Sequence, residues 1–348
     1  MVKVTPRFII LVLGITALVT ASAAIVYAWL YNNQHYAVRV GILYSETGAM
    51  ATNELPIIDA LLMGIEEINN SGGVLGKSIE PIIADGASDP ITFGNQAEKL
   101  ITERKVDVIF GCWTSASRKR VKPIVEKYDN LLFYPLQYEG LENSANIIYT
   151  GAAANQQLLP GITWCYFNIG NSFFLVGSDY VFPRTANVVI KNYIDAFDIT
   201  IVGEVYHPLS SMDFTDTVQK ILKAQPKVII NTLNGNSNVA FFAELKKAGI
   251  TAQKIPVMSF SIAEEELRTT LKNQDLTGNY ATWSYFQSVN TPESIQFVEK
   301  FKKKYGQHRV VSDPMEAAYF GVHLWAQAVK YAKLLIPQSL KIKPKNKD

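Results

Sequence analysis

Apolar positions along the chain alternate between two spacings: short β-branched runs and longer stretches with a helical repeat. The run 38–45 (VRVGILYS) is of the first kind, and apolar residues then recur at helical spacing from Leu55 to Ile68, before Gly72 and Gly73. Strands are expected next at 79–86, 106–111 and 131–135, separated by helices through 97–101 and 115–128. Alternation of this kind predicts a parallel sheet with helices on both faces.

A second series of the same kind follows 147–157 (IIYTGAAANQQ), where small and amide residues interrupt the pattern. The strands expected in it are 173–178, 199–208, 227–233 and 255–261, with helices after Pro183, from Asp213 and from Ser237. The segment 277–286 is expected to be a crossing strand, and two more helices are expected near 292–305 and 314–335. Two α/β sets joined by irregular stretches predict two lobes with a cleft between them.

The predicted division of the chain follows from these two series. Lobe 1 comprises 37–150 and 284–335, lobe 2 comprises 151–283, and 336–348 is a basic tail that we expect to be solvated. Residues 1–36 precede the lobes. In them, Lys3 and Arg7 flank an uncharged stretch, Phe8 to Leu30, that is long enough to span a bilayer. An uncleaved membrane anchor is favoured over cleavage near Ala21-Ser22-Ala23. The basic flank is expected to keep the N-terminus in the cytoplasm, which would place the lobes at the periplasmic face of the inner membrane.

Composition narrows the class of protein. The 348 residues are 48% hydrophobic and 18% charged, which fits one or two globular domains. A net charge of +2 gives no argument for nucleic acid as a partner. The two cysteines, Cys112 and Cys165, are expected to be separately buried thiols, because one ends an apolar strand and the other lies in a helix-like segment.

No catalytic or metal-binding motif is present in the sequence. The segment 71–78 (SGGVLGKS) is close to a phosphate-binding loop, but it has Ser71 where the first glycine is required and it precedes a strand, so a tight turn is predicted. The four histidines are scattered, no cofactor is expected, and nothing nominates a partner that would activate Cys112 as a nucleophile. The expectation is therefore a protein that is not an enzyme.

Four loops that follow expected strands carry aromatic and hydrogen-bonding side chains. They are 112–115 (CWTS), 134–140 (YPLQYEG), 178–184 (SDYVFPR) and 231–236 (NTLNGN). Open α/β sheets gather ligands at the carboxyl ends of their strands. Each loop is compatible with an ordinary polar turn, but together they suit a small polar ligand held between aromatic faces.

Longer motifs make the sequence resemble a known family. The opening VGILYSETGAMA and EEINNSGGVLGKSIEP are similar to the start of type I periplasmic binding proteins for amino acids, amides and urea. The segments FGCWTSASRK, LLFYPLQYEG, IIYTGAAANQQ, GSDYVFPRTAN, NGNSNVAFFAEL and DPMEAAYFG resemble the branch of urea-binding transporter components and amide-sensing regulators. The resemblance covers about residues 37 to 335 and implies a two-lobed α/β fold.

The resemblance also implies which residues hold the ligand. They are Trp113, Ser115, Tyr134, Gln137, Tyr180, Asn236 and Glu316. Two departures stand out: Asn236 takes a place that is usually acidic in urea binders, and the family usually continues for about 60 residues beyond the helix ending near Leu335. On that pattern we expect the C-terminal segment of the family to be missing.

The function expected from these observations is binding of urea or a short amide as the substrate-binding component of an ABC transporter. The named candidates other than Glu316 are uncharged, which favours a neutral ligand, because an unpaired buried charge is costly. The expected partners are the ligand, ABC permease subunits or a membrane signalling partner, and the membrane itself through the N-terminal helix. A membrane-tethered sensor is the first alternative and an amidase-like enzyme the second.

Overall fold

The computed structural model describes residues 18–23 and 37–332. Residues 18–23 are helical and lie inside the predicted span Phe8–Leu30, the rest of which is outside the described residues, as is the tail 336–348. Within the described ranges, no helix combines the length and the apolar content needed to cross a bilayer. The membrane anchor therefore stays a prediction from the sequence.

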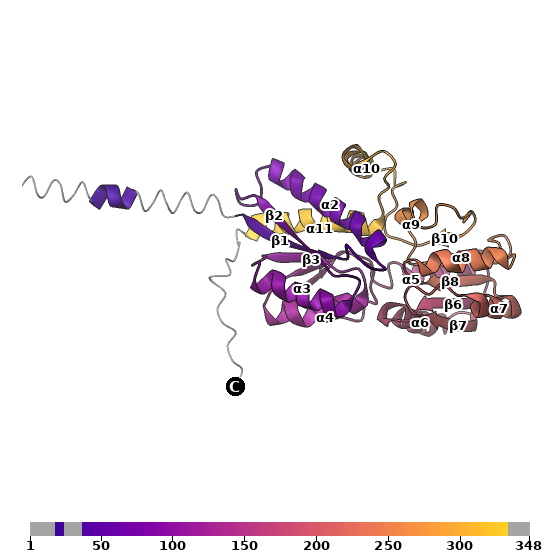
Figure 1. Cartoon of the computed structure of the whole chain (residues 1–348). Helices are drawn as coiled ribbons and strands as arrows, with labels where there is room; N and C mark the ends of the chain where they lie inside the picture. Colours follow the sequence, from indigo (N-terminus) through magenta and orange to yellow (C-terminus); the bar gives the residue numbers. More distant parts are fainter. Residues whose placement is uncertain (1–17, 24–36, 333–348) are drawn as a thin grey trace, which may run out of the picture.

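Two five-stranded parallel sheets form two lobes that lie side by side (Figure 1). The strand order of the first sheet is β2-β1-β3-β4-β5. Its strands are β1 (Val38–Tyr44), β2 (Ile79–Asp85), β3 (Val108–Gly111), β4 (Leu132–Tyr134) and β5 (Ile147–Tyr149). The second sheet has the order β10-β9-β8-β6-β7. Its strands are β6 (Ser172–Ser178), β7 (Thr200–His207), β8 (Val228–Thr232), β9 (Val257–Ser259) and β10 (Tyr280–Ala281).

Helices cover both faces of each sheet, as the alternating pattern predicts (Figure 1). In lobe 1, α2 packs against α11 and α10, while α3 packs against α4. These helices are α2 (Ala51–Asn70), α3 (Pro90–Thr102), α4 (Ser115–Lys127), α10 (Pro292–Tyr305) and α11 (Asp313–Ala332). The helices of lobe 2 are α5 (Leu158–Asn168), α6 (Val181–Ile194), α7 (Thr215–Ala224), α8 (Ser237–Lys247) and α9 (Glu264–Arg268).

The core of lobe 2 shows how strand alternation builds two layers. Along β6, Phe173 and Leu175 pack in one buried cluster with residues of α5 and α6, whereas Phe174 and Val176 pack in another with residues of α7 and α8. Successive side chains of a strand point to opposite faces, so an unbroken apolar run is what a doubly covered strand requires. The predicted two-lobed α/β fold is confirmed.

Local signals set several element boundaries. Asp89 and Thr291 cap α3 and α10, each accepting a hydrogen bond from a backbone N–H and each followed by proline. Gly73 has a φ of 71°, and a Cβ there would lie 2.0 Å from the carbonyl oxygen of Lys77. A tight turn that only glycine fits therefore joins α2 to β2, which confirms the turn predicted in place of a phosphate-binding loop.

Two predicted elements differ from the structure. The crossing strand predicted at 277–286 is wrong for most of its length, because only β10 pairs with β9. The irregular stretch predicted at 147–157 contains the short strand β5. Within residues 37–332, the chain leaves lobe 1 between β5 and α5 and returns to lobe 1 between β10 and α10. The predicted lobe boundaries fall inside these two connections.

Candidate functional site

The carboxyl ends of the strands in the two lobes meet, and hydrogen bonds join them. Gln137, which follows β4, donates from Nε2 to the carbonyl oxygen of Phe260 after β9, at 3.0 Å. Gln157 donates from Nε2 to the carbonyl oxygen of Thr282 at 2.7 Å. Asn53 of α2 donates to Glu266 of α9. The loop that carries Gln137, one of the four chosen from the sequence, therefore lies at an interface between lobes, where α/β proteins bind ligands.

Three of the predicted ligand-binding residues lie together at the edge of lobe 1. Tyr134 donates its hydroxyl hydrogen to the carbonyl oxygen of Trp113 at 2.7 Å, and Ser115 begins α4 directly after this turn. Trp113, Ser115 and Tyr134 are 6%, 1% and 0% exposed. They form the lobe 1 wall of the interface.

The turn between β3 and α4 is built by two neighbouring residues. Cys112 has a φ of 69°, in the left-handed region, which reverses the chain at the end of β3. Thr114 is the N-cap of α4 and accepts a hydrogen bond from the backbone N–H of Ser117 at 3.1 Å. The cap of this helix is thus Thr114, and the hydroxyl of Ser115 is left for another contact.

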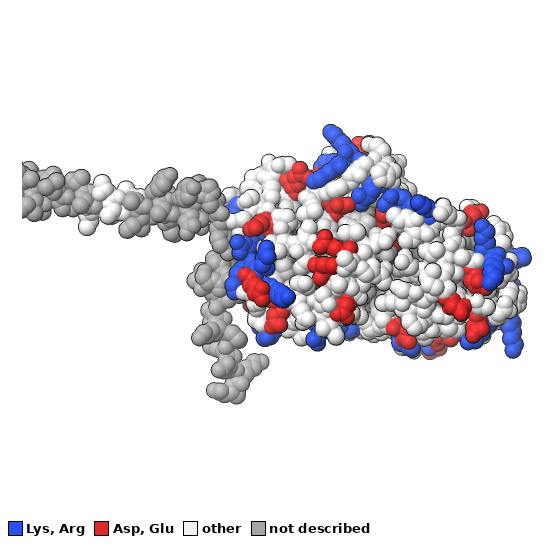
Figure 2. Space-filling view, viewed as in Figure 1, with Lys and Arg blue, Asp and Glu red and all other residues white. Residues whose placement is uncertain are grey.

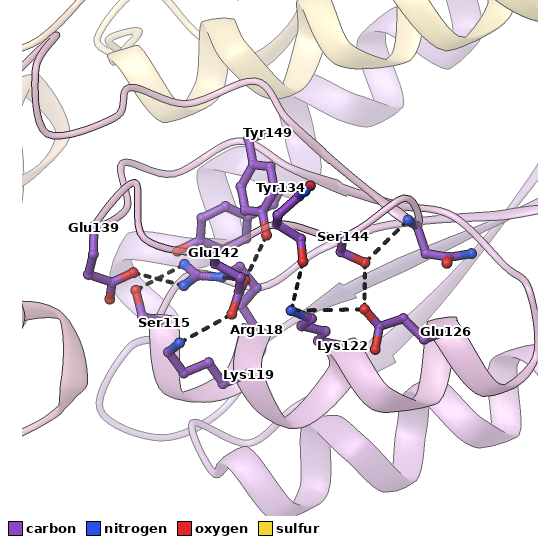
Figure 3. Close-up of polar contacts among 12 residues, drawn as sticks. Ser115, Arg118, Lys119, Lys122, Glu126, Tyr134, Glu139, Glu142, Ser144 and Tyr149 are labelled. Carbon is purple, nitrogen blue, oxygen red and sulfur yellow. Dashed lines mark hydrogen bonds and ion pairs between the residues drawn. The ribbon is translucent and has the colours of Figure 1, made fainter.

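That contact is with Arg118, whose guanidinium is fully buried in lobe 1 (Figure 3). Arg118 donates from Nη1 to Ser115 Oγ at 3.0 Å, from Nη2 to Glu139 at 2.8 Å, and from Nε to Glu142 at 2.9 Å. It also lies 4.8 Å from the ring centroid of Tyr134. All three guanidinium nitrogens of Arg118 therefore donate hydrogen bonds to residues of lobe 1.

The Glu142 carboxylate beside this arginine is held as a charged group. Burial by itself raises the pKa of Glu142, but hydrogen bonds from Tyr149, Lys119 and Arg118 and the charge of Arg118 outweigh it and lower the pKa to about 2. Burial alone lowers the pKa of Arg118, whereas Tyr134, Glu139 and Glu142 raise it far more. The cluster is a compensated set of charges, so it does not require a charged ligand.

Two acceptor oxygens of this interface lack a partner among the described residues. Gln137 Oε1 and Glu139 Oε1 are buried without a hydrogen-bond donor, although the other polar atom of each side chain is satisfied. Buried acceptors are rarely left unpaired without a functional reason. Both are available to N–H groups that enter between the lobes.

Tyr180 is the lobe 2 residue that faces this cluster. It immediately precedes α6, which contacts α4 of lobe 1. The pKa of Tyr180 is raised well above its ordinary value, first by burial and then by the nearby Tyr134 and Glu139. The structure thus brings Trp113, Ser115, Tyr134, Gln137 and Tyr180 to one interface, and their role in ligand binding stays a prediction.

The other two predicted residues lie elsewhere. Asn236 is exposed at the start of α8, and its side chain makes no cap hydrogen bond. The neighbouring Gly235 lies close to Ala49 and Met50 of lobe 1. Glu316 lies on α11 and lines a separate pocket with residues of α10. The structure does not bring these two side chains to the Tyr134 cluster.

A second group of buried polar residues at the same interface was not chosen from the sequence. Glu54 accepts a hydrogen bond from the backbone N–H of Ser45 at 2.6 Å, and burial raises the pKa of Glu54 to about 8. Burial also raises the pKa of Glu266 to about 7, and this residue accepts the hydrogen bond from Asn53. A polar residue on the apolar face of a helix, such as Glu54, is the signal that could have found this group.

Metal binding is not indicated in the part of the chain that is described. Within residues 18–23 and 37–332, no three His, Cys, Asp or Glu side chains are arranged to hold a metal ion. On the face shown in Figure 2, acidic and basic side chains are interspersed over both lobes, so no field of one sign dominates it. Both cysteines are buried and free, which confirms the separately buried thiols predicted from the sequence.

The fold and the interface define a two-lobed binding protein of the type I class. The chain belongs to the periplasmic binding protein family, because residues 38–345 match that family's "Periplasmic binding protein domain". Members of this family are solute-binding proteins, which agrees with the prediction of a protein that is not an enzyme. Membership implies an extracytoplasmic location.

Individual relatives are distant. The chain is 21% identical to Leu/Ile/Val-binding protein homolog 4 of Brucella melitensis over 321 residues, which covers 85% of this chain and 73% of that protein. A 56-residue stretch is 41% identical to limonene hydroxylase of Geobacillus stearothermophilus, and it covers 16% of this chain and 10% of that protein. Because this stretch is a tenth of the hydroxylase, its activity carries no argument for the whole chain.

Solved structures share the fold at low sequence identity. A solute binding protein of an ABC transporter from Rhodopseudomonas palustris, in complex with 3,4-dihydroxybenzoic acid, is similar with a TM-score of 0.78 and 22% identity, covering 87% of this chain and 83% of that one. A branched-chain amino acid transporter substrate binding protein from Streptococcus pneumoniae, in complex with isoleucine, is similar with a TM-score of 0.75 and 19% identity, covering 86% and 85%. These matches support the fold, and their ligands belong to those proteins.

Proposed function

We propose that this protein binds a small uncharged ligand rich in N–H groups, such as urea or a short amide, between its two lobes. The observation that carries this proposal is a pair of buried acceptors without a donor among the described residues, Gln137 Oε1 and Glu139 Oε1, beside Tyr134 and Tyr180. Urea and amides offer N–H donors to such acceptors and flat faces to aromatic rings.

The charges at the interface favour a neutral ligand over a carboxylate. Among the described residues, Arg118 is the one lysine or arginine that is buried, and Glu139, Glu142 and Ser115 already engage it. An amino acid or a benzoate would bring a carboxylate into this interface, where the described residues offer no buried cation that is still unpaired. Burying an unpaired carboxylate is costly, so these ligands are disfavoured here.

Binding in this position suits the substrate-binding component of an ABC transporter. Gln137 and Asn53 already form hydrogen bonds from lobe 1 to lobe 2. A ligand held by both lobes favours their closed arrangement, which a permease can read. The membrane anchor, and signalling in place of transport, stay predictions from the sequence.

Calorimetric titration with urea, acetamide, leucine and benzoate tests the proposal. We expect urea or acetamide to bind, and Gln137→Met to weaken that binding about tenfold through loss of one buried hydrogen bond. Gln253→Met, on an exposed residue of lobe 2, is the matched control and leaves the affinity unchanged. Binding of leucine or benzoate without binding of urea or an amide would contradict the proposal, as would an unchanged affinity in Gln137→Met.

A further inference from the structure

A second pocket lies in lobe 1, between α10, α11 and the connection that leads into α10. It has a volume of about 340 Å³, in the range of small-ligand sites. Four aromatic rings line it: Tyr285, Phe297, Tyr319 and Phe320. Phe297 and Tyr319 are stacked, with ring centroids 4.5 Å apart, and Phe320 is 49% exposed at the edge.

The ionisable side chains of this pocket make it electronegative. Glu316 and Glu293 line it, and its lining contains neither lysine nor arginine. His323 also lines it, and burial lowers the pKa of this imidazole, which disfavours its charged form. The pocket therefore combines the negative faces of aromatic rings with carboxylates.

The Glu316 carboxylate lacks a partner within the described residues. No described side chain or backbone N–H donates a hydrogen bond to it, and no lysine or arginine forms an ion pair with it. Partial burial raises the pKa of Glu316, because it disfavours the charged form of the carboxylate. By contrast, the carboxylate of Glu67 on α2 forms an ion pair with Lys300 and accepts a hydrogen bond from the hydroxyl of Tyr319.

We propose that this pocket is a binding site for a small organic cation, such as an alkylated ammonium ion. A cation over the aromatic faces gains cation–π attraction, and the partly buried Glu316 supplies the counter-charge. An anion would be repelled by Glu316 and Glu293. A neutral apolar molecule would fill the volume but leave the Glu316 carboxylate without a partner.

The site is independent of the ligand proposed between the lobes. None of the residues that line it belongs to the cluster of Trp113, Ser115, Tyr134, Gln137 and Tyr180. The two sites also differ in the ligand they favour. At the lobe interface the charge of Arg118 is paired with Glu139 and Glu142, which favours a neutral ligand, whereas the pocket is lined by Glu293 and Glu316, which favours a cation. Failure of one proposal therefore leaves the other standing.

Saturation-transfer NMR titration with tetramethylammonium, at constant ionic strength, tests the inference on the purified protein. We expect saturable binding that Glu316→Gln weakens at least about tenfold, while the exposed Glu299→Gln on α10 leaves it unchanged. tert-Butyl alcohol, a neutral molecule of similar shape, is expected not to compete. Trp113→Ala, in the lobe interface, is expected to retain the binding.

Two further readouts keep the test decisive. Phe320→Ala removes a half-exposed ring and is expected to fold normally and weaken binding about threefold or more, so it replaces Glu316→Gln if that variant is unstable. Absence of saturable binding to the wild type, or equal affinity in the wild type and Phe320→Ala, would overturn the inference. Competition by tert-butyl alcohol at equal concentration would also overturn it, since charge would then not be recognised.

Discussion

Replacing Arg118 by methionine should destabilise lobe 1 more than any surface charge substitution. Arg118 is fully buried, and its guanidinium lies 2.8 Å from Glu139 and 2.9 Å from Glu142. Methionine fills a similar volume but leaves Glu139, 4% exposed, without a counter-charge, and leaves Glu142, 6% exposed, with only the half-exposed Lys119. Breaking a buried ion pair by removing one partner costs about 3–5 kcal/mol, so we expect a loss of that size in the free energy of unfolding.

Guanidinium-induced unfolding followed by circular dichroism measures this loss, because urea is itself a candidate ligand. Lys119→Met is the matched control: Lys119 also contacts Glu142, at 3.2 Å, but its side chain is 45% exposed, and we expect about 0–1 kcal/mol. Adding Glu139→Gln and Glu142→Gln to Arg118→Met should recover at least half of the stability, since no unpaired charge stays buried. A cost below about 1 kcal/mol for Arg118→Met, or a less stable triple variant, would refute the reasoning.

Three further outcomes are expected. Tyr180→Ala should weaken binding of the best ligand by about 1–3 kcal/mol in calorimetry with little effect on the melting temperature, and unchanged affinity would remove Tyr180 from the site. Thr114→Ala should lower the free energy of unfolding by about 1 kcal/mol through loss of the α4 cap. A larger loss of stability in Ser115→Ala would show that the hydrogen bond from Arg118 to Ser115 contributes more than the cap. Glu54 has a folded pKa of about 8 against 4.5 unfolded, so its contribution is fully present below pH 4.5 and is lost as the pH rises through 8. Glu54→Gln should therefore flatten the fall in melting temperature over that range, and an unchanged slope would contradict the assignment.

The strands were predictable from sequence where burial on both faces leaves an unbroken apolar run. The crossing strand predicted at 277–286 failed beyond β10 because Trp283 and Tyr285 are held by contacts other than strand pairing. Trp283 donates from Nε1 to the carbonyl oxygen of Ile262, and the backbone N–H of Tyr285 donates to the carboxylate of Asp313. An alternating apolar pattern records burial, and burial alone does not specify a ladder.

The sequence could indicate those residues of the candidate site that lie in loops directly after strands. Trp113, Tyr134 and Tyr180 could be chosen because loops after parallel strands share one edge. Arg118 could not, because a charged residue in the polar helix sequence SASRKR is ordinarily solvated, and its partner Glu139 is 21 residues away in the chain. Pairing over that distance leaves no periodic trace in the sequence.

The two buried thiols make this protein a convenient carrier for a fluorescent reporter. Cys112 and Cys165 are the only cysteines of the chain, and burial raises the pKa of both. Thiol-directed dyes react with the thiolate of accessible cysteines, so neither native residue should compete for label. Asn236→Cys would place a dye on an exposed position beside Gly235, which lies against lobe 1. Its emission would report lobe movement directly, without removal of any native cysteine.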